Sequence, residues 1–375
     1  MNKKKEGRYI LKKMKIEVDA LIYELNNDEA TLVGNKIDKV IDLDIPRKII
    51  YENKEYTVTE IAPQVFKNNR FINWVSIPST VKKVGAECFA SSSIKELYFE
   101  QIVALHEVEI GESLCHDSIR LEYVHLASGI TSISSKSFYN CISLIEINTP
   151  WRITSINNHA YCNCYNLKHF DFTELITTIG ESAFYGTNLN YAEIGSHVKS
   201  VGDLAFANIE NLKTLVAASH DYEMGDQIIS NKNRITVYLK GDEQSKNVKL
   251  FREKASKDHY FIVDDFNLIE HEGIKYLKFS KNVVRVIGYN ESNIESHVTI
   301  PDQIEGAPVT DFQPGAFKYS NKIEKVVFPK SILRNKGKVF EGTSNLKKVV
   351  FQHPLTLDEA RWIVSNDNVE IEILN

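Results

Sequence analysis

Two histidines and two cysteines that could bind zinc lie close together in the middle of the chain: His159, Cys162, Cys164 and His169. Cys164 and Cys141, however, occupy the same position of a recurring motif, so both thiols are expected to point into a core. Cys162 takes the motif position of Tyr139, and His169 falls on the outward side of a predicted strand. We therefore expect no metal and no cofactor, and we predict two buried reduced thiols, with a Cys141–Cys164 disulfide as the alternative.

No catalytic motif is found among the many Ser, His and Asp residues. The sequence contains no G-x-S-x-G, Walker-type or H-E-x-x-H pattern. The pair Asp264 and Asp265 is expected to be a solvated turn rather than a calcium site. The five cysteines are spread along 375 residues, which is not a small disulfide scaffold. We therefore predict that the protein is not an enzyme.

Charge and hydropathy argue against two classes of partner. The net charge is −5, whereas a general nucleic-acid binder carries a basic face, so we expect no nucleic acid as a partner. No run of 18 apolar residues occurs, so we predict no membrane span. Residues 1–15 are rich in Lys and Arg without an apolar segment behind them, which predicts a basic tail rather than an export signal. Binding of nucleic acid or an anionic membrane by this tail is the alternative.

The His and Cys residues discussed above lie within a sequence repeat, which determines where their side chains point. Ile176 to Ser219 consists of two similar halves of 22 residues each, in which Phe184 aligns with Phe206. Aromatic anchors recur along the chain: Phe66, Phe89, Phe138, Tyr161, Phe184 and Phe206. Their steps are 22–23 residues except between Phe89 and Phe138, where the gap of 49 divides into 26 and 23 if Cys115 takes the anchor position. A fixed period of this length is the signature of a solenoid.

Each repeat ends in a segment L-x-x-V-x-I/F/L, which predicts a short strand that stacks on the next one about 4.8 Å away. Its outward side chains should form a column of exposed groups. Aromatic groups in such a column are typical interface anchors, although sheet surfaces also favour them through cross-strand pairing. The predicted binding residues on this face are Trp74, Tyr98, Tyr123, His125, His169, Tyr191, Glu146, Asp171 and Glu193. If they do not bind, we expect the contact surface at a bulged loop, Glu100–Glu109.

The repeats divide the chain into five parts. We predict a basic tail at 1–15, an N-terminal cap of strands at 16–56, an array of about seven repeats at 57–219, a cap or linker at 220–266, and a second, shorter array with its own caps at 267–375. Helices are predicted at 243–257 and 356–365. The outward side of the second array is smaller and more basic, so we expect it to stabilise or orient rather than to recognise a partner.

The motif V-x-x-I-G-x-x-A-F-x-x-(C/N)-x-x-L-x-x-V-x-I-P resembles the BspA-type leucine-rich repeat. Ile176–Ile194 and Ile130–Pro150 match it best, and the resemblance covers roughly 57–219 and 298–352, with departures at Cys115 and Tyr161. It implies an α+β repeat solenoid: a right-handed, strand-dominated leucine-rich-repeat solenoid with β-hairpin N-terminal caps and helix-strand C-terminal caps.

The resemblance also implies a function in binding, because the family shares no catalytic residues and is commonly secreted or displayed on cell surfaces in adhesion. The chain as given shows no export signal or membrane span, so localisation stays open between the cytoplasm and the surface. We predict a monomeric, non-enzymatic protein that binds a protein or peptide through the curved strand face. The alternative is a structural module that assembles with itself.

Overall fold

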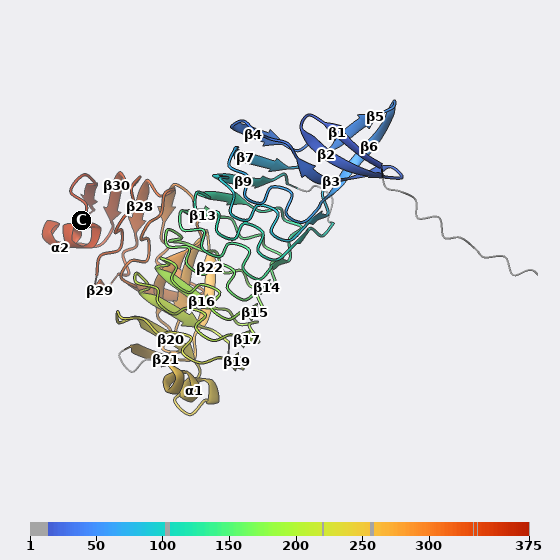
Figure 1. The fold of residues 1–375 in the computed structure, drawn as a ribbon. Helices are drawn as coiled ribbons and strands as arrows, with labels where there is room; N and C mark the ends of the chain where they lie inside the picture. The colour runs from blue at the N-terminus through green and yellow to red at the C-terminus, as the bar shows by residue number, and fades with distance from the viewer. Residues whose placement is uncertain are drawn as a thin grey trace, which may run out of the picture.

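The computed structural model is a curved solenoid in which a second array packs beside a first one (Figure 1). It describes residues 14–101, 106–219, 221–255, 259–332, 334–335 and 337–374. Residues 1–13 of the predicted tail and residues 102–105 of the predicted 100–109 loop lie outside this range. The first array runs from the N-terminal hairpins through helix α1 to strand β21, and the second ends with helix α2 and strand β31.

One side of the first array is built from parallel strands stacked coil on coil, as predicted. Five of them form a sheet in the order β13-β11-β9-β7-β4: β4 (Ile41–Asp44), β7 (Ile72–Ile77), β9 (Glu96–Phe99), β11 (Tyr123–His125) and β13 (Glu146–Ile147). Four more continue the column as β16 (Tyr191–Ile194), β18 (Thr214–Ala217), β20 (Thr236–Lys240) and β21 (Tyr260–Asp264). The column is the strand face on which the predicted binding residues lie.

The other side of each coil carries a second, shorter strand that the sequence pattern did not reveal. These strands have two residues each and pair in parallel with their neighbours: β8 (Lys83–Val84), β10 (Glu109–Ile110), β12 (Ser132–Ile133), β14 (Ser155–Ile156), β15 (Thr178–Ile179), β17 (Ser200–Val201) and β19 (Glu223–Met224). Alternation of apolar and polar residues cannot be seen over two positions, so periodicity alone could not identify them.

The predicted aromatic ladder runs through the core between the two sides. The rings of Phe66 and Phe89 stack at 5.2 Å, and Phe184 stacks on Phe206 at 5.5 Å. Cys115 fills the anchor position between Phe89 and Phe138, is fully buried, and donates its backbone N–H to Ser137 in the next coil, as the aromatic anchors do. The assignment of Cys115 to the ladder is therefore confirmed.

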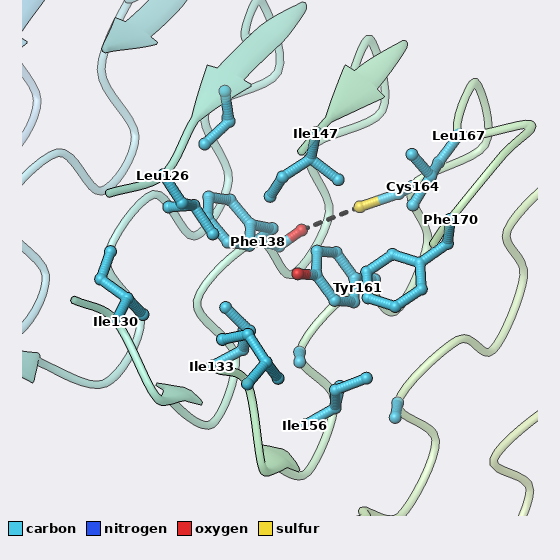
Figure 2. Close-up of a cluster of buried hydrophobic side chains, with 14 of the residues drawn as sticks. Leu126, Ile130, Ile133, Phe138, Ile147, Ile156, Tyr161, Cys164, Leu167 and Phe170 are labelled. Carbon is cyan, nitrogen blue, oxygen red and sulfur yellow. Dashed lines mark hydrogen bonds between the residues drawn. The ribbon is translucent and has the colours of Figure 1, made fainter. Parts of the chain in front are cut away.

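The paired cysteine positions lie in the same core. Cys141 and Cys164 are free and fully buried, and each thiol lies 3.1 Å from a carbonyl oxygen of the preceding coil, that of Cys115 and that of Phe138 respectively. Figure 2 shows Cys164 pointing toward Phe138 among the ladder residues. Burial raises the pKa of both thiols, so they stay protonated near neutral pH. The prediction of two buried thiols is confirmed.

The two arrays begin with similar antiparallel caps. The first contains β1 (Met14–Val18), β2 (Leu21–Asn26) and β3 (Glu29–Asn35); the second contains β22 (Asn267–His271), β23 (Ile274–Lys278) and β24 (Val284–Tyr289). Both have the same bulge, before Tyr23 and before Tyr276, opposite Gly34 and Gly288. A hairpin of β5 (Lys48–Tyr51) and β6 (Lys54–Ile61), which was not predicted as strands, joins the first cap to the coils.

The coils continue past Ser219, since β19 pairs with β17 and β20 pairs with β18. Helix α1 (Lys246–Lys254) and β21 then close the first array. The remaining elements of the second array are β25 (His297–Thr299), β26 (Gln303–Ile304), β27 (Ala307–Phe312), β28 (Lys325–Phe328), β29 (Arg334–Asn335), β30 (Lys348–Phe351), α2 (Leu357–Val364) and β31 (Glu370–Ile373). Neither helix among the described residues is long and apolar enough to cross a membrane.

Candidate functional site on the strand face

The second array covers the C-terminal part of the strand face. Tyr191, Asp171 and Glu193 point away from the core of their own coils, as predicted, but they are only 7%, 6% and 6% exposed. Their expected exposure to solvent is therefore wrong. The alternation of a strand fixes which side a residue faces, whereas a cap about a hundred residues further along decides whether that side is covered.

A buried ion pair joins the two arrays. Lys275 of β23 places its Nζ 2.8 Å from Glu193 Oε2, and the Tyr191 hydroxyl donates to the same oxygen at 2.8 Å. The Lys275 ammonium also lies 5.3 Å from the centre of the Tyr191 ring. Burial by itself would lower the pKa of Lys275, but the Glu193 carboxylate raises the pKa above its ordinary value, so the pair stays charged.

A second polar cluster joins the arrays at His169. Its ring stacks on Tyr289 at 4.8 Å, and its Nε2 lies 2.7 Å from Asp171 Oδ1. Asp171 also accepts hydrogen bonds from the hydroxyl and the backbone N–H of Ser292. Burial opposes ionisation of Asp171, but His169 and Ser292 outweigh burial and hold the pKa of this carboxyl well below its usual range. His169 therefore contacts the second array and stays only partly exposed.

The described parts of the chain leave the N-terminal part of the strand face uncovered. On β7, β9 and β11 the side chains of Trp74, Tyr98, Tyr123 and His125 are partly exposed, and Glu146 on β13 is exposed. Tyr98 and His125 have ring centres 5.8 Å apart, and His125 Nε2 lies 3.7 Å from Glu96 Oε1. We call this surface the open strand face and define it by Asp42, Trp74, Glu96, Tyr98, Tyr123, His125 and Glu146.

Strand register orders the open strand face into a row of alternating chemistry. Asp42 pairs with Trp74, Trp74 with Glu96, Glu96 with Tyr123, and Tyr123 with Glu146. Acid and aromatic groups therefore alternate across five adjacent strands. Sequence reasoning did not include Asp42 in the face, because its strand was assigned to the cap. The alternation in Ile41-Asp42-Leu43-Asp44, which places both acids on one side, was the signal that could have found it.

A cleft of about 270 Å³ lies where the open strand face meets the second array. Glu146 and Lys168 line it from the first array, and Glu291, Tyr319 and Lys322 line it from the second. Lys168 Nζ lies 4.7 Å from the centre of the Tyr319 ring, so this lysine already has an aromatic partner. The cleft extends the open strand face beyond Glu146 and carries charges of both signs.

The four potential zinc ligands do not come together. Cys164 lies in the core, His169 contacts Tyr289, and His159 is directed toward Tyr139 and Glu181. Cys162 is also buried, and burial raises its pKa to about 11. Across the described part of the chain, no group of three or more His, Cys, Asp or Glu residues could hold a metal ion. Asp264 instead accepts a hydrogen bond from the Ser280 N–H.

The stacked coils, the aromatic ladder and the strand face define a leucine-rich-repeat solenoid. The model of the BspA-type leucine-rich repeat region matches in six copies over residues 49–108, 108–236 and 270–361, which is more than half of the chain. The protein therefore belongs to the BspA-type leucine-rich repeat family, as the sequence motif indicated. Members of this family are generally non-enzymatic.

Solved structures of similar repeat proteins come from several bacteria. A leucine rich cell surface protein of Faecalibacterium prausnitzii is 17% identical, with 96% of this chain and 95% of that chain covered and a TM-score of 0.42. For the pneumococcal vaccine antigen PcpA the identity is 14%, the coverage 96% and 99%, and the TM-score 0.45. A T. pallidum leucine rich repeat protein is 20% identical, with 57% of this chain and 87% of that chain covered and a TM-score of 0.42. No curated protein sequence matches the chain.

Proposed function

We propose that the protein is a non-enzymatic binding protein that recognises a protein or peptide partner through the open strand face. The observation that carries this proposal is the set of partly exposed Trp, Tyr and His side chains on adjacent strands that the second array leaves uncovered. Large aromatic groups provide much contact area at low entropic cost. Because the strands are hydrogen-bonded into a rigid sheet, little ordering free energy is lost on binding. Adhesion to another cell or a host protein is the biological setting that we propose.

The second array has a supporting role in this proposal. It covers the C-terminal strands through the Lys275–Glu193 pair and the Asp171 cluster, and so removes Tyr191 and Asp171 from the contact surface. Its own outward lysines are paired with neighbouring acids: Lys347 lies 2.9 Å from Glu324, and Lys348 lies 2.7 Å from Glu370.

Replacing Trp74 and Tyr123 together by Ala should strongly reduce capture of the partner. Tagged wild-type and variant proteins would be incubated with extracts of the source organism and of host tissue, and captured proteins would be identified by mass spectrometry. Trp151→Ala is the matched control, because Trp151 is 61% exposed but lies outside the open strand face. Once a partner is identified, we expect the double variant to lose roughly 1–3 kcal/mol of binding free energy with an unchanged melting curve. Equal capture by all three proteins would contradict the proposal.

A further inference from the structure

The covered half of the strand face shows which chemistry this face accepts. There, Tyr191 and Glu193 project from the same strand, and one lysine of the second array occupies the space beside them. Lys275 makes an ion pair with the acid at 2.8 Å and lies 5.3 Å from the centre of the aromatic ring. An acid next to an aromatic ring therefore binds an ammonium group in two ways, through charge and through the face of the ring.

The open strand face repeats this pairing of acid and aromatic without a cation in place. Trp74 lies between Asp42 and Glu96 on neighbouring strands, and Tyr123 lies between Glu96 and Glu146. Within the described parts of the chain, no Lys or Arg forms a salt bridge with Asp42, Glu96 or Glu146. Asp42 accepts a hydrogen bond from Asn73 at 3.1 Å, and the Glu96 carboxylate lies 3.7 Å from His125 Nε2.

We propose that the partner segment is cationic and places Lys or Arg side chains against Trp74 and Tyr123, as Lys275 is placed against Tyr191. This inference rests on the proposed function and names the chemistry of the partner. The acids at Asp42, Glu96 and Glu146 give the row a negative charge that a cationic segment complements and that an acidic peptide or a nucleic acid would oppose.

The spacing of the row also defines the conformation of the segment. Successive rings of the row, Trp74 and Tyr123, are two strands apart, and so are successive acids. Two strands correspond to about 9.6 Å at the usual distance between strands. A polyproline II helix places every third residue on the same side at about 9.3 Å. In a fully extended strand, alternate residues are only about 6.7 Å apart, which does not match the row. We therefore expect Lys or Arg at every third position of a polyproline II-like segment that crosses the strands.

The experiment uses labelled synthetic peptides with the full-length protein. A peptide of about twelve residues that repeats Lys-Pro-Pro has the expected charge, conformation and spacing. Its first control repeats Glu-Pro-Pro, and its second has the same composition with all lysines adjacent. Fluorescence anisotropy should detect binding of the first peptide, weaker binding of the adjacent-lysine peptide and no binding of the glutamate peptide. Binding should also weaken markedly at about 0.5 M salt, because exposed charges are then screened.

Protein variants connect this binding to the row. Glu96→Gln and Trp74→Ala should each weaken binding of the Lys-Pro-Pro peptide by about fivefold or more. Glu181→Gln and Trp151→Ala are the matched controls, because both residues are exposed and lie outside the open strand face, and neither should change the affinity. Circular dichroism melting would establish that all four variants fold.

The outcomes separate this inference from the proposed function. If the Lys-Pro-Pro peptide does not bind, or binds Glu96→Gln as tightly as wild type, the inference is overturned. In that case, capture of a natural partner that still depends on Trp74 and Tyr123 would leave the proposed function intact. If neither the peptide nor a captured partner responds to these substitutions, both are overturned. Equal binding of the spaced and adjacent lysine peptides would overturn the polyproline II geometry.

Discussion

At the scale of single residues, Lys275 and Glu193 decide how the two arrays fit together. Their side chains are 4% and 7% exposed, so neither charge can be stabilised by water. Each is stabilised instead by its partner, and Glu193 is further held by the Tyr191 hydroxyl. Such a pair contributes little net free energy compared with two apolar groups, but the loss of one partner leaves a buried, uncompensated charge.

Replacing Lys275 by Met should therefore destabilise docking of the second array by about 3–5 kcal/mol, because Glu193 then remains buried without its cation. The double variant Lys275→Met with Glu193→Leu should recover most of this loss. The matched control is Lys347→Met, since Lys347 is 69% exposed in its pair with Glu324 and should cost less than about 1 kcal/mol. Denaturant unfolding measures all three variants, and a Lys275→Met protein as stable as wild type would contradict the prediction.

At the scale of the coil, stability comes from contacts between successive turns of the solenoid. Backbone N–H groups donate from one coil to the next on both sides, as Gly202 does to Ile179 and Phe206 does to Ile228. The coils approach closely at the glycine position, where a Cβ on Gly202 would lie 2.3 Å from the backbone nitrogen of Glu181. Ser134 occupies the same motif position in another coil, so the backbone conformation there accepts a residue with a side chain. At Gly202 a side chain is therefore disfavoured by the short distance to the neighbouring coil and not by the backbone dihedral angles.

Gly202→Ala should destabilise the first array by about 2 kcal/mol or more, because the added methyl group meets backbone that cannot move without shifting a whole coil. Gly195→Ala provides the matched control, since its Cβ would meet only one side-chain atom, at 3.7 Å. Thermal melting followed by circular dichroism compares the two variants. If both melt at the wild-type temperature, the close contact does not determine coil spacing.

At the scale of the whole molecule, docking of the second array divides the strand face into a covered and an open part. The docked surface combines apolar and polar contacts. Leu277 and Ile287 of the second array belong to the same buried cluster as Tyr191 and Tyr238 of the first. Besides the Lys275–Glu193 pair, Asn190 donates to the Gly315 carbonyl at 3.0 Å and Tyr238 donates to Gln313 at 2.6 Å. Because ionisable groups such as Asp171 and Lys275 are among these contacts, docking should respond to pH in a way that the apolar core does not.

Acid should weaken docking through Asp171. Its pKa is lowered in the docked structure, so docking is stabilised above the ordinary aspartate value of 3.8, and the stabilisation is lost as pH falls below 3.8 toward the lowered pKa. His169, Ser292 and Lys275 are the groups that favour the charged form. Hydrogen exchange of β22–β24 at pH 5 and pH 3 would measure the loss. Asp171→Asn should exchange faster at pH 5 and show a smaller change with pH, and an unchanged pH response in this variant would contradict the prediction.

The sequence by itself determined the repeat, the ladder with Cys115 in it, the buried thiols at Cys141 and Cys164, and the side of each strand on which a residue lies. These features depend on contacts between neighbouring coils, which recur at a nearly constant separation along the chain, so they leave a periodic pattern in the sequence. The caps were identified in the same way, since the second repeats the first, although the two-residue strands were too short to show alternation.

Only the tertiary structure decided which part of the strand face is open. Lys275 and Glu193 are 82 residues apart, and Asn190 and Gly315 are 125 apart. Each of these contacts occurs once, so no period reveals it, and Tyr191 and Tyr123 have equivalent outward positions in the sequence although one is buried and the other partly exposed. A local pattern fixes the direction of a side chain, whereas its exposure depends on the free energy of docking a distant surface.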